Sequence, residues 1–306
     1  MISRPLFCLI LMLSALTYAE PVDLTWPNEI TGFASMTDRA QEIKIRGVDF
    51  IYPPLQKVLT RNPATAAARF ERRKLKVLID PGHGGRDDGA QGLYQISEKT
   101  VALKVSKMVQ KELERYSKLN DFPIQVELTR ADDFFVNLRD RNRIANEWEA
   151  DLFLSIHLNS SPHPKARGFE VYFMSSNASD AAAAKLAHLE NQGVRVDTRS
   201  PVQNILSDVQ LNHHVSESSE FAESVFSAIS TRVLSSGRAV RQAPFAVLHG
   251  TEMPAVLIEI GYLTHSEDAK NLSYDPYLKR MANAITSGVV EFAKKRIQRK
   301  QKVGLG

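Results

Sequence analysis

The sequence has almost no cysteine. Cys8 is the single cysteine among 306 residues, and it lies in an apolar run near the N-terminus. A chain cut after Ala19 therefore contains no thiol. This excludes disulfide bonds, a cysteine nucleophile and a cysteine-ligated metal site, so the stability of the protein must come from its packed core.

A strong excess of charge and a long apolar run are also lacking. The chain has 39 basic and 35 acidic side chains, a balance that does not point to a nucleic-acid partner. The apolar run Pro5–Leu16 is too short to span a membrane. Arg4 precedes it and Thr17–Ala19 follows it, which is the pattern of a secretory signal peptide. We therefore expect residues 1–19 to be removed and the protein to be exported, to the periplasm or out of the cell, without a membrane span.

The remaining sequence predicts one folded domain behind a leader. Residues 20–74 are mixed in composition, with one strand expected at Ile43–Tyr52, and we interpret them as an N-terminal leader or tether. Residues 75–298 carry the regular pattern of a folded domain, which contains the candidate catalytic residues described below, and residues 299–306 form a basic tail. We find no repeat or second folded domain, and we expect a monomer.

Hydrophobic periodicity alternates between strand and helix along the predicted domain. Apolar or alternating runs predict strands at 76–80, 124–130, 151–158, 168–174, 243–248 and 255–261. Helical spacing predicts one helix that begins at Glu98 and four further helices at 138–148, 180–190, 217–234 and 276–297. Such a β-α-β-α-β order implies right-handed crossovers. We therefore predict an α/β fold with a mostly parallel twisted sheet of about six strands and helices on both faces.

A glycine-rich loop follows the first predicted strand. The sequence Asp80-Pro-Gly-His-Gly-Gly85 stops the strand and places His83 among glycines, which leave room for a ligand. Ser97 is a suitable N-cap, so Glu98 would lie in the first turn of the next helix. His83 and Glu98 are therefore expected to lie close together.

Two later strands deliver further candidate ligands. His157 lies in the run at 151–158, and Glu259 lies in the run at 255–261. The carboxyl ends of parallel strands share one rim of an open α/β sheet, where active sites lie. His83, Glu98 and His157 would form a catalytic zinc triad with a fourth position left for water, and Glu259 would be the general base.

Four ordered blocks resemble the zinc-dependent N-acetylmuramoyl-L-alanine amidases of bacterial cell-wall cleavage. They lie at 79–85 with Glu98, at 128–132 with 138–139 and 143–146, at 155–157, and at 254–261. Carried over position by position, the resemblance implies that His83, Glu98 and His157 bind one Zn²⁺ per chain. It also implies that Glu259 is the catalytic glutamate.

The resemblance implies an amidase that cleaves the bond between N-acetylmuramic acid and L-alanine in peptidoglycan, for wall remodelling or daughter-cell separation. Two alternatives stay open. One is a zinc peptidase that acts within the stem peptide, and the other is a non-catalytic peptidoglycan-binding or activator protein on an amidase fold. Arg86 and Asn159 lie in or beside the ligand blocks, so we regard them as candidate substrate contacts.

The stretch between His157 and Glu259 is longer than its expected elements require. The surplus lies at about 190–214, where cell-division amidases of the resembling family carry a helix that covers the zinc site until an activator protein moves it. The resemblance thus implies a regulatory insert, with Glu190 and Asp208 as candidate autoinhibitory carboxylates. An ordinary surface helix is the alternative.

Overall fold

The computed structural model describes residues 41–45, 48–52, 74–192, 194, 196, 205–233 and 237–303. The predicted signal peptide, most of the predicted leader and the end of the basic tail lie outside these residues, so their boundaries stay predictions. The chain divides into two compact units, Met1–Asn62 and Pro63–Gly306. Among the described helices, none combines the length and the apolar character that a membrane crossing requires.

The first unit contains a two-stranded antiparallel sheet. β1 (Gln41–Ile45) pairs with β2 (Val48–Tyr52). The prediction of one continuous strand at Ile43–Tyr52 is wrong. The dipeptide between the two strands contains Gly47, and short glycine-containing connections are typical of β-hairpins.

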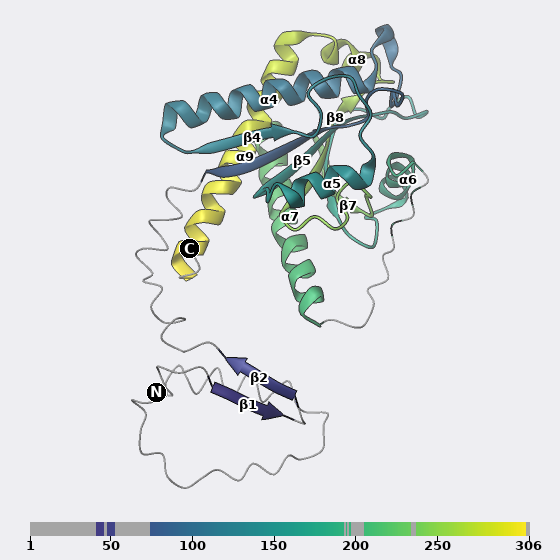
Figure 1. Cartoon of the computed structure of the whole chain (residues 1–306). Helices are drawn as coiled ribbons and strands as arrows, with labels where there is room; N and C mark the ends of the chain where they lie inside the picture. The colour runs from purple at the N-terminus through teal and green to yellow at the C-terminus, as the bar shows by residue number, and fades with distance from the viewer. Residues whose placement is uncertain are drawn as a thin grey trace. The chain divides into compact units, whose positions relative to one another are not determined.

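The second unit is built on a six-stranded sheet (Figure 1). Its strands are β3 (Leu75–Pro81), β4 (Ile124–Leu128), β5 (Leu152–Asn159), β6 (Phe169–Met174), β7 (Gly237–Ala243) and β8 (Ala255–Tyr262). Their spatial order is β4-β3-β5-β8-β6-β7, and every neighbouring pair is parallel except β6 with β8. The predicted mostly parallel sheet is confirmed.

Helices cover both faces of this sheet, as Figure 1 shows for α4 and α5 on either side of β3. They are η1 (Leu93–Gln95), α4 (Glu98–Asn120), α5 (Leu138–Glu147), α6 (Ala181–Glu190), α7 (Ile205–Arg232), α8 (Ser266–Leu272) and α9 (Asp275–Val303). Val77 and Leu154 belong to the core cluster formed with α4, α7 and α9. Leu78 and Phe153, one position away, belong to the cluster formed with α5 and α6. The core is therefore two layers separated by the alternation of strand side chains.

Several elements differ from the sequence prediction. The strand expected at 243–248 ends where it was predicted to begin, because Pro244 cannot donate a ladder hydrogen bond. The apolar residues after it, including Phe245, are buried but belong to no strand or helix. The helix expected at 217–234 begins at Ile205, since neither glycine nor proline interrupts the sequence from there. The short η1 and α8 were not predicted, because so few residues show no clear period.

Candidate metal centre

A row of buried polar side chains crosses the sheet on the face that α5 and α6 cover. Phe153 of β5 points into that layer, so His157 and Asn159 point into it too. His157 is paired with Glu259 of β8, and Glu259 is paired with Glu170 of β6. Because β6 runs antiparallel to β8, its amino end lies at the carboxyl edge of the parallel strands. Three strands therefore bring titratable side chains to one edge.

His83 lies in the loop after β3 and has a left-handed backbone with φ of 57°. Its Nδ1 is 3.0 Å from Oδ2 of Asp87, which fixes the ring. Two glycines leave room for the imidazole rings of His83 and His157. A Cβ on Gly82 would lie 2.6 Å from Nε2 of His157, and a Cβ on Gly89 would lie 2.7 Å from Cδ2 of His83. A side chain at either glycine would push a predicted ligand out of place.

Glu98 is the first residue of α4 and is almost completely buried. Its carboxylate accepts hydrogen bonds from the Ala90 amide at 2.8 Å and the Leu158 amide at 2.9 Å. Burial acts to raise the pKa of Glu98, but the charge of His83 and a hydrogen bond with His157 outweigh it and lower that pKa. Glu98 is thus a fixed carboxylate that links the loop, the helix and β5.

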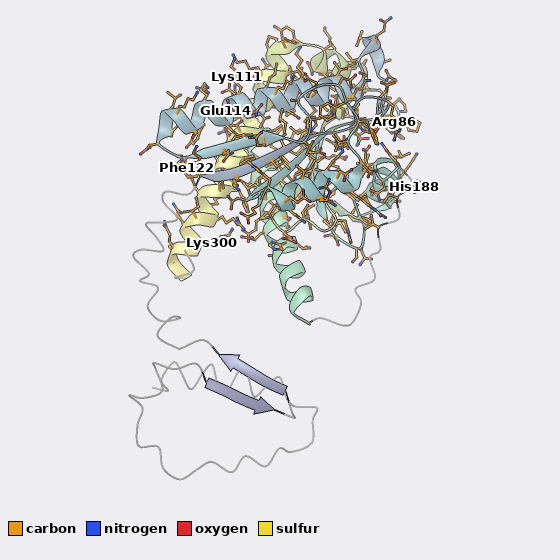
Figure 2. The ribbon with its side chains drawn as sticks, viewed as in Figure 1. Arg86, Lys111, Glu114, Phe122, His188 and Lys300 are labelled. Atoms are coloured by element: carbon orange, nitrogen blue, oxygen red, sulfur yellow. The ribbon has the colours of Figure 1, made fainter. Side chains whose placement is uncertain are left out.

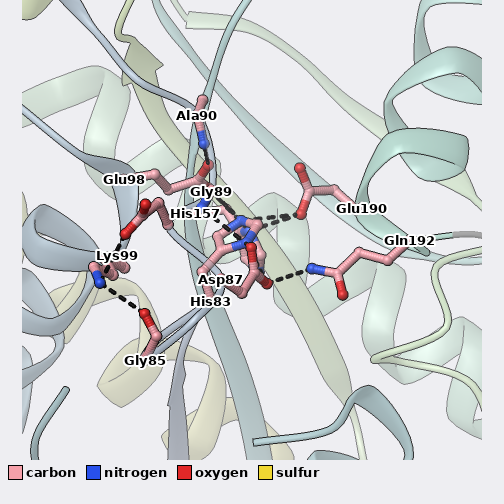
Figure 3. Close-up of polar contacts among 12 residues, drawn as sticks. His83, Gly85, Asp87, Gly89, Ala90, Glu98, Lys99, His157, Glu190 and Gln192 are labelled. Atoms are coloured by element: carbon pink, nitrogen blue, oxygen red, sulfur yellow. Dashed lines mark hydrogen bonds and ion pairs between the residues drawn. The ribbon is translucent and has the colours of Figure 1, made fainter. Parts of the chain in front are cut away.

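Four ligand-type atoms converge at this point (Figure 3). Oε1 of Glu98 lies 3.1 Å from Nε2 of His83 and 3.1 Å from Nδ1 of His157. Oε2 of Glu190 lies 3.4 Å and 3.0 Å from the same two nitrogens. All four atoms lie within 4.8 Å of one another. The structure therefore brings the three predicted ligands together with Glu190 from the end of α6.

Four of the separations between these atoms, at 3.0 to 3.4 Å, are close to those between ligands of a tetrahedral metal ion. Within the described part of the chain, His83 Nε2 and Glu190 Oε2 are buried and have no hydrogen-bond partner, although they face each other. Four ligands at about 2.1 Å from a tetrahedral ion lie roughly 3.4 Å apart. Imidazole nitrogens and carboxylate oxygens are also donors that zinc accepts. The residues present therefore fit a zinc ion.

The electrostatics of the cluster favour a cation at its centre. Burial alone would lower the pKa of His83, but Glu98, Asp87 and Glu190 together raise it to about 12. Burial opposes a charge on His157 as well, yet Glu190 and Glu98 raise its pKa to about 10. The carboxylates thus outweigh desolvation at both histidines. The negative charge of these carboxylates therefore stabilises positive charge at the two histidines.

Glu259 lies beside the cluster in the middle of the sheet. It is completely buried, and within the described residues neither of its carboxylate oxygens has a hydrogen-bond partner. Burial raises its pKa well above the usual value, and the negative charge of Glu190 raises it further. Glu259 is therefore a buried carboxyl, paired with His157 in the sheet, whose two oxygens accept no hydrogen bond from the described residues.

The end of α6 and the two residues that follow it close the site. Glu190 contacts both histidines, and the Gln192 side-chain amide donates a hydrogen bond to Asp87. The cavity left between these side chains and the start of α5 has a volume of about 10 Å³, about the room that one water needs. Asp208, the second candidate carboxylate, lies in α7, and its side chain is outside the described residues.

The two candidate substrate contacts occupy different surroundings. Arg86 is exposed at the edge of the domain (Figure 2), with its guanidinium carbon 4.4 Å from the ring centroid of Phe135. Asn159 is buried, and its Nδ2 donates to Oε2 of Glu170 at 3.3 Å. The hydroxyl of Tyr172 donates to the same oxygen at 2.8 Å. Arg86 can therefore meet a ligand from solvent, while Asn159 is engaged with a neighbour of Glu259.

Sequence reasoning gave no role to several residues that complete the site. Asp87 orients His83, and Gln192 contacts Asp87. Arg130 and Arg141 are almost completely buried under the His83 loop. Only Arg130 stood in one of the quoted blocks. Arginine is mostly exposed in proteins, so the burial of Arg130 and Arg141 had no signal in the sequence.

Comparison with known proteins gives one consistent result. Residues 77–291 match the Amidase_3 family, described as N-acetylmuramoyl-L-alanine amidase. The chain is 33% identical over 226 residues to the N-acetylmuramoyl-L-alanine amidase AmiA of Escherichia coli K12, covering 72% of this chain and 76% of that protein. The solved structure of AmiC2 of Nostoc punctiforme is similar with a TM-score of 0.55 and 33% identity, over 72% of this chain and 98% of that one. An amidase structure from Clostridium difficile 630 gives a TM-score of 0.56 and 28% identity, over 73% and 98%.

Proposed function

Because the chain belongs to the Amidase_3 family of N-acetylmuramoyl-L-alanine amidases, we propose that it cleaves the N-acetylmuramic acid to L-alanine amide of peptidoglycan with one zinc ion per chain. Membership of this enzyme class follows from the match over residues 77–291. The zinc dependence is carried by one observation, the convergence of His83, Glu98 and His157 on a centre of ligand dimensions.

In this proposal His83, Glu98 and His157 hold the metal, and Asp87 fixes the ring of His83. When bound, zinc lowers the pKa of a coordinated water to about 7 and polarises a carbonyl oxygen. Glu259 accepts a proton from the attacking water and returns it to the departing amine of L-alanine. Its position beside His157 and the absence of a partner on its oxygens within the described residues support that role.

The same geometry supports a restrained enzyme. Glu190 occupies the fourth ligand position of the cluster, which a catalytic zinc site leaves for water. A cavity of about 10 Å³ has no room for a glycan or a stem peptide. We propose that the end of α6 and the insert at about 190–214 hold the enzyme inactive until an activator protein displaces them.

Replacing Glu190 with alanine is expected to raise basal activity on peptidoglycan about tenfold, since an intramolecular contact worth about 1.4 kcal/mol accounts for a factor of ten. The measurement is the initial rate of stem-peptide release from purified sacculi. Leu189→Ala is the matched control, because Leu189 is the preceding residue of α6 and is exposed. Equal or lower activity of a folded, zinc-loaded Glu190→Ala protein would contradict the restraint but not the amidase function.

The function itself is tested by digesting purified sacculi with and without a chelator and identifying the released fragments by mass spectrometry. We expect free peptides that begin with L-alanine, lost with the chelator and restored by zinc. Fragments cut within the stem peptide would instead support the zinc peptidase. Absence of release by both the full chain and Glu190→Ala, with zinc bound, would favour a non-catalytic binding protein. Export to the periplasm or medium and a role in daughter-cell separation stay predictions, which localisation of the protein in cells would test.

A further inference from the structure

Arg141 is buried under the His83 loop with every nitrogen of its guanidinium engaged. Its side chain is 2% exposed. It donates to Asp80 Oδ1, to the Pro81 carbonyl and to the His83 carbonyl, each at 2.8 Å. Its remaining donors meet the Val136 carbonyl at 2.9 and 3.1 Å. One guanidinium therefore holds the end of β3, the backbone of His83 and the loop before α5 in a single arrangement.

Arg130 lies two residues after the end of β4, is 1% exposed and supplies the complementary contacts. Its Nε donates to the Pro81 carbonyl at 3.0 Å. One terminal nitrogen donates to the Gly82 carbonyl at 2.7 Å and to the Lys99 carbonyl at 2.9 Å. Gly82 precedes His83 in the chain, and Lys99 follows Glu98. Arg130 thus joins the backbones next to two of the proposed zinc ligands.

The burial of both arginine side chains is energetically unfavourable unless their contacts compensate for the lost hydration. Two guanidinium groups are desolvated together, and Asp80 is the one carboxylate that pairs directly with either of them in the described residues. Burying a charged group is costly unless hydrogen bonds compensate for the lost hydration. The compensation comes largely from the carbonyls of three successive residues that end at His83, whose left-handed φ of 57° is rare for a residue with a side chain. The arginines therefore fix an otherwise unfavourable loop conformation.

We propose that Arg130 and Arg141 are positioning residues of the metal centre. They hold His83 and Glu98 at the separation of metal ligands before the metal binds. The free energy of metal binding is therefore not reduced by the cost of ordering the loop. This inference rests on the proposed zinc site. A lysine cannot replace either arginine, because one ammonium group cannot reach carbonyls on several sides at once.

The test compares zinc affinity and stability in three full-length variants. Arg130→Lys and Arg141→Lys keep the positive charge but remove the planar guanidinium group and its several hydrogen-bond donors. Arg296→Lys is the matched control, because Arg296 is a largely buried arginine with two hydrogen bonds to Glu217. Arg296 lines a cavity with Phe122 and Lys300. Figure 2 shows Phe122 and Lys300 on the side of the domain away from Arg86. Zinc affinity is measured by competition with a chromogenic chelator, and urea unfolding of the metal-free proteins gives their stability.

We expect zinc to bind ten- to a hundredfold more weakly to Arg130→Lys and Arg141→Lys, the range seen when groups that orient metal ligands are removed. The metal-free variants should still unfold cooperatively, and Arg296→Lys should keep wild-type affinity. Unchanged affinity in both loop variants, with zinc bound by the wild type, would overturn the positioning role alone. Loss of cooperative unfolding in both would show that the arginines support the whole fold, and would overturn it too. A wild type that does not bind zinc would remove the metal centre itself.

Discussion

Glu259→Gln is expected to leave zinc bound and to lower the turnover of peptidoglycan about a thousandfold, within the range contributed by general acid-base groups. Glutamine has nearly the same shape as glutamate but cannot accept a proton from water or return one to an amine. Glu259 is outside the group of four side chains that converge as ligands, so metal affinity should not change. Stability should not fall either, because burial disfavours the charged form of Glu259 and glutamine is a neutral group of nearly the same shape.

The comparison needs zinc content, thermal stability and peptide release measured on the same preparations. Glu252→Gln is the matched control, since Glu252 is exposed in the turn that precedes β8. It should behave as wild type in all three measurements. A folded, zinc-loaded Glu259→Gln protein that retains even a tenth of wild-type turnover would remove Glu259 from the proposed proton transfers.

The residues that converge on the centre were predictable because each is tied to a regular element. His83 follows β3, Glu98 begins α4, and His157 and Glu259 lie in β5 and β8. In a parallel sheet the carboxyl ends of strands share an edge, so the order of elements alone brings these residues near one another. Their exact separation depends on the glycines at 82 and 89, whose importance as points of close approach emerges only with the backbone path.

The remaining parts of the site depend on loop conformation and strand direction, which hydrophobic periodicity does not predict. Glu170 is paired with Glu259 because β6 is antiparallel to β8, and the predicted mostly parallel sheet did not indicate which strand would be reversed. Arg141 meets Asp80 across a separation of 61 positions in the chain. No local pattern predicts such a contact, and the two side chains read as ordinary surface charges. The polar support of the ligands was therefore the least predictable part of the molecule.

His157→Ala is expected to abolish zinc binding at micromolar metal and to lower activity by about ten thousandfold or more, the factor that corresponds to several kcal/mol of metal-supplied stabilisation. His157 provides one of only three proposed permanent ligands. Its loss also leaves the carboxylates of Glu98 and Glu190 facing a single histidine. The measurements are zinc content after dialysis and peptide release from sacculi with added zinc.

His249→Ala controls for the loss of an imidazole, since His249 is exposed in the turn region after β7. It should keep both zinc and activity. Full zinc content in a folded His157→Ala protein would contradict the ligand assignment. The two variants at neighbouring strand positions then separate two functions: Glu259→Gln should be inactive with metal, and His157→Ala should be inactive without it. If both lose activity but both keep zinc, the metal lies elsewhere, and the paired residues of β5 and β8 act on the substrate instead.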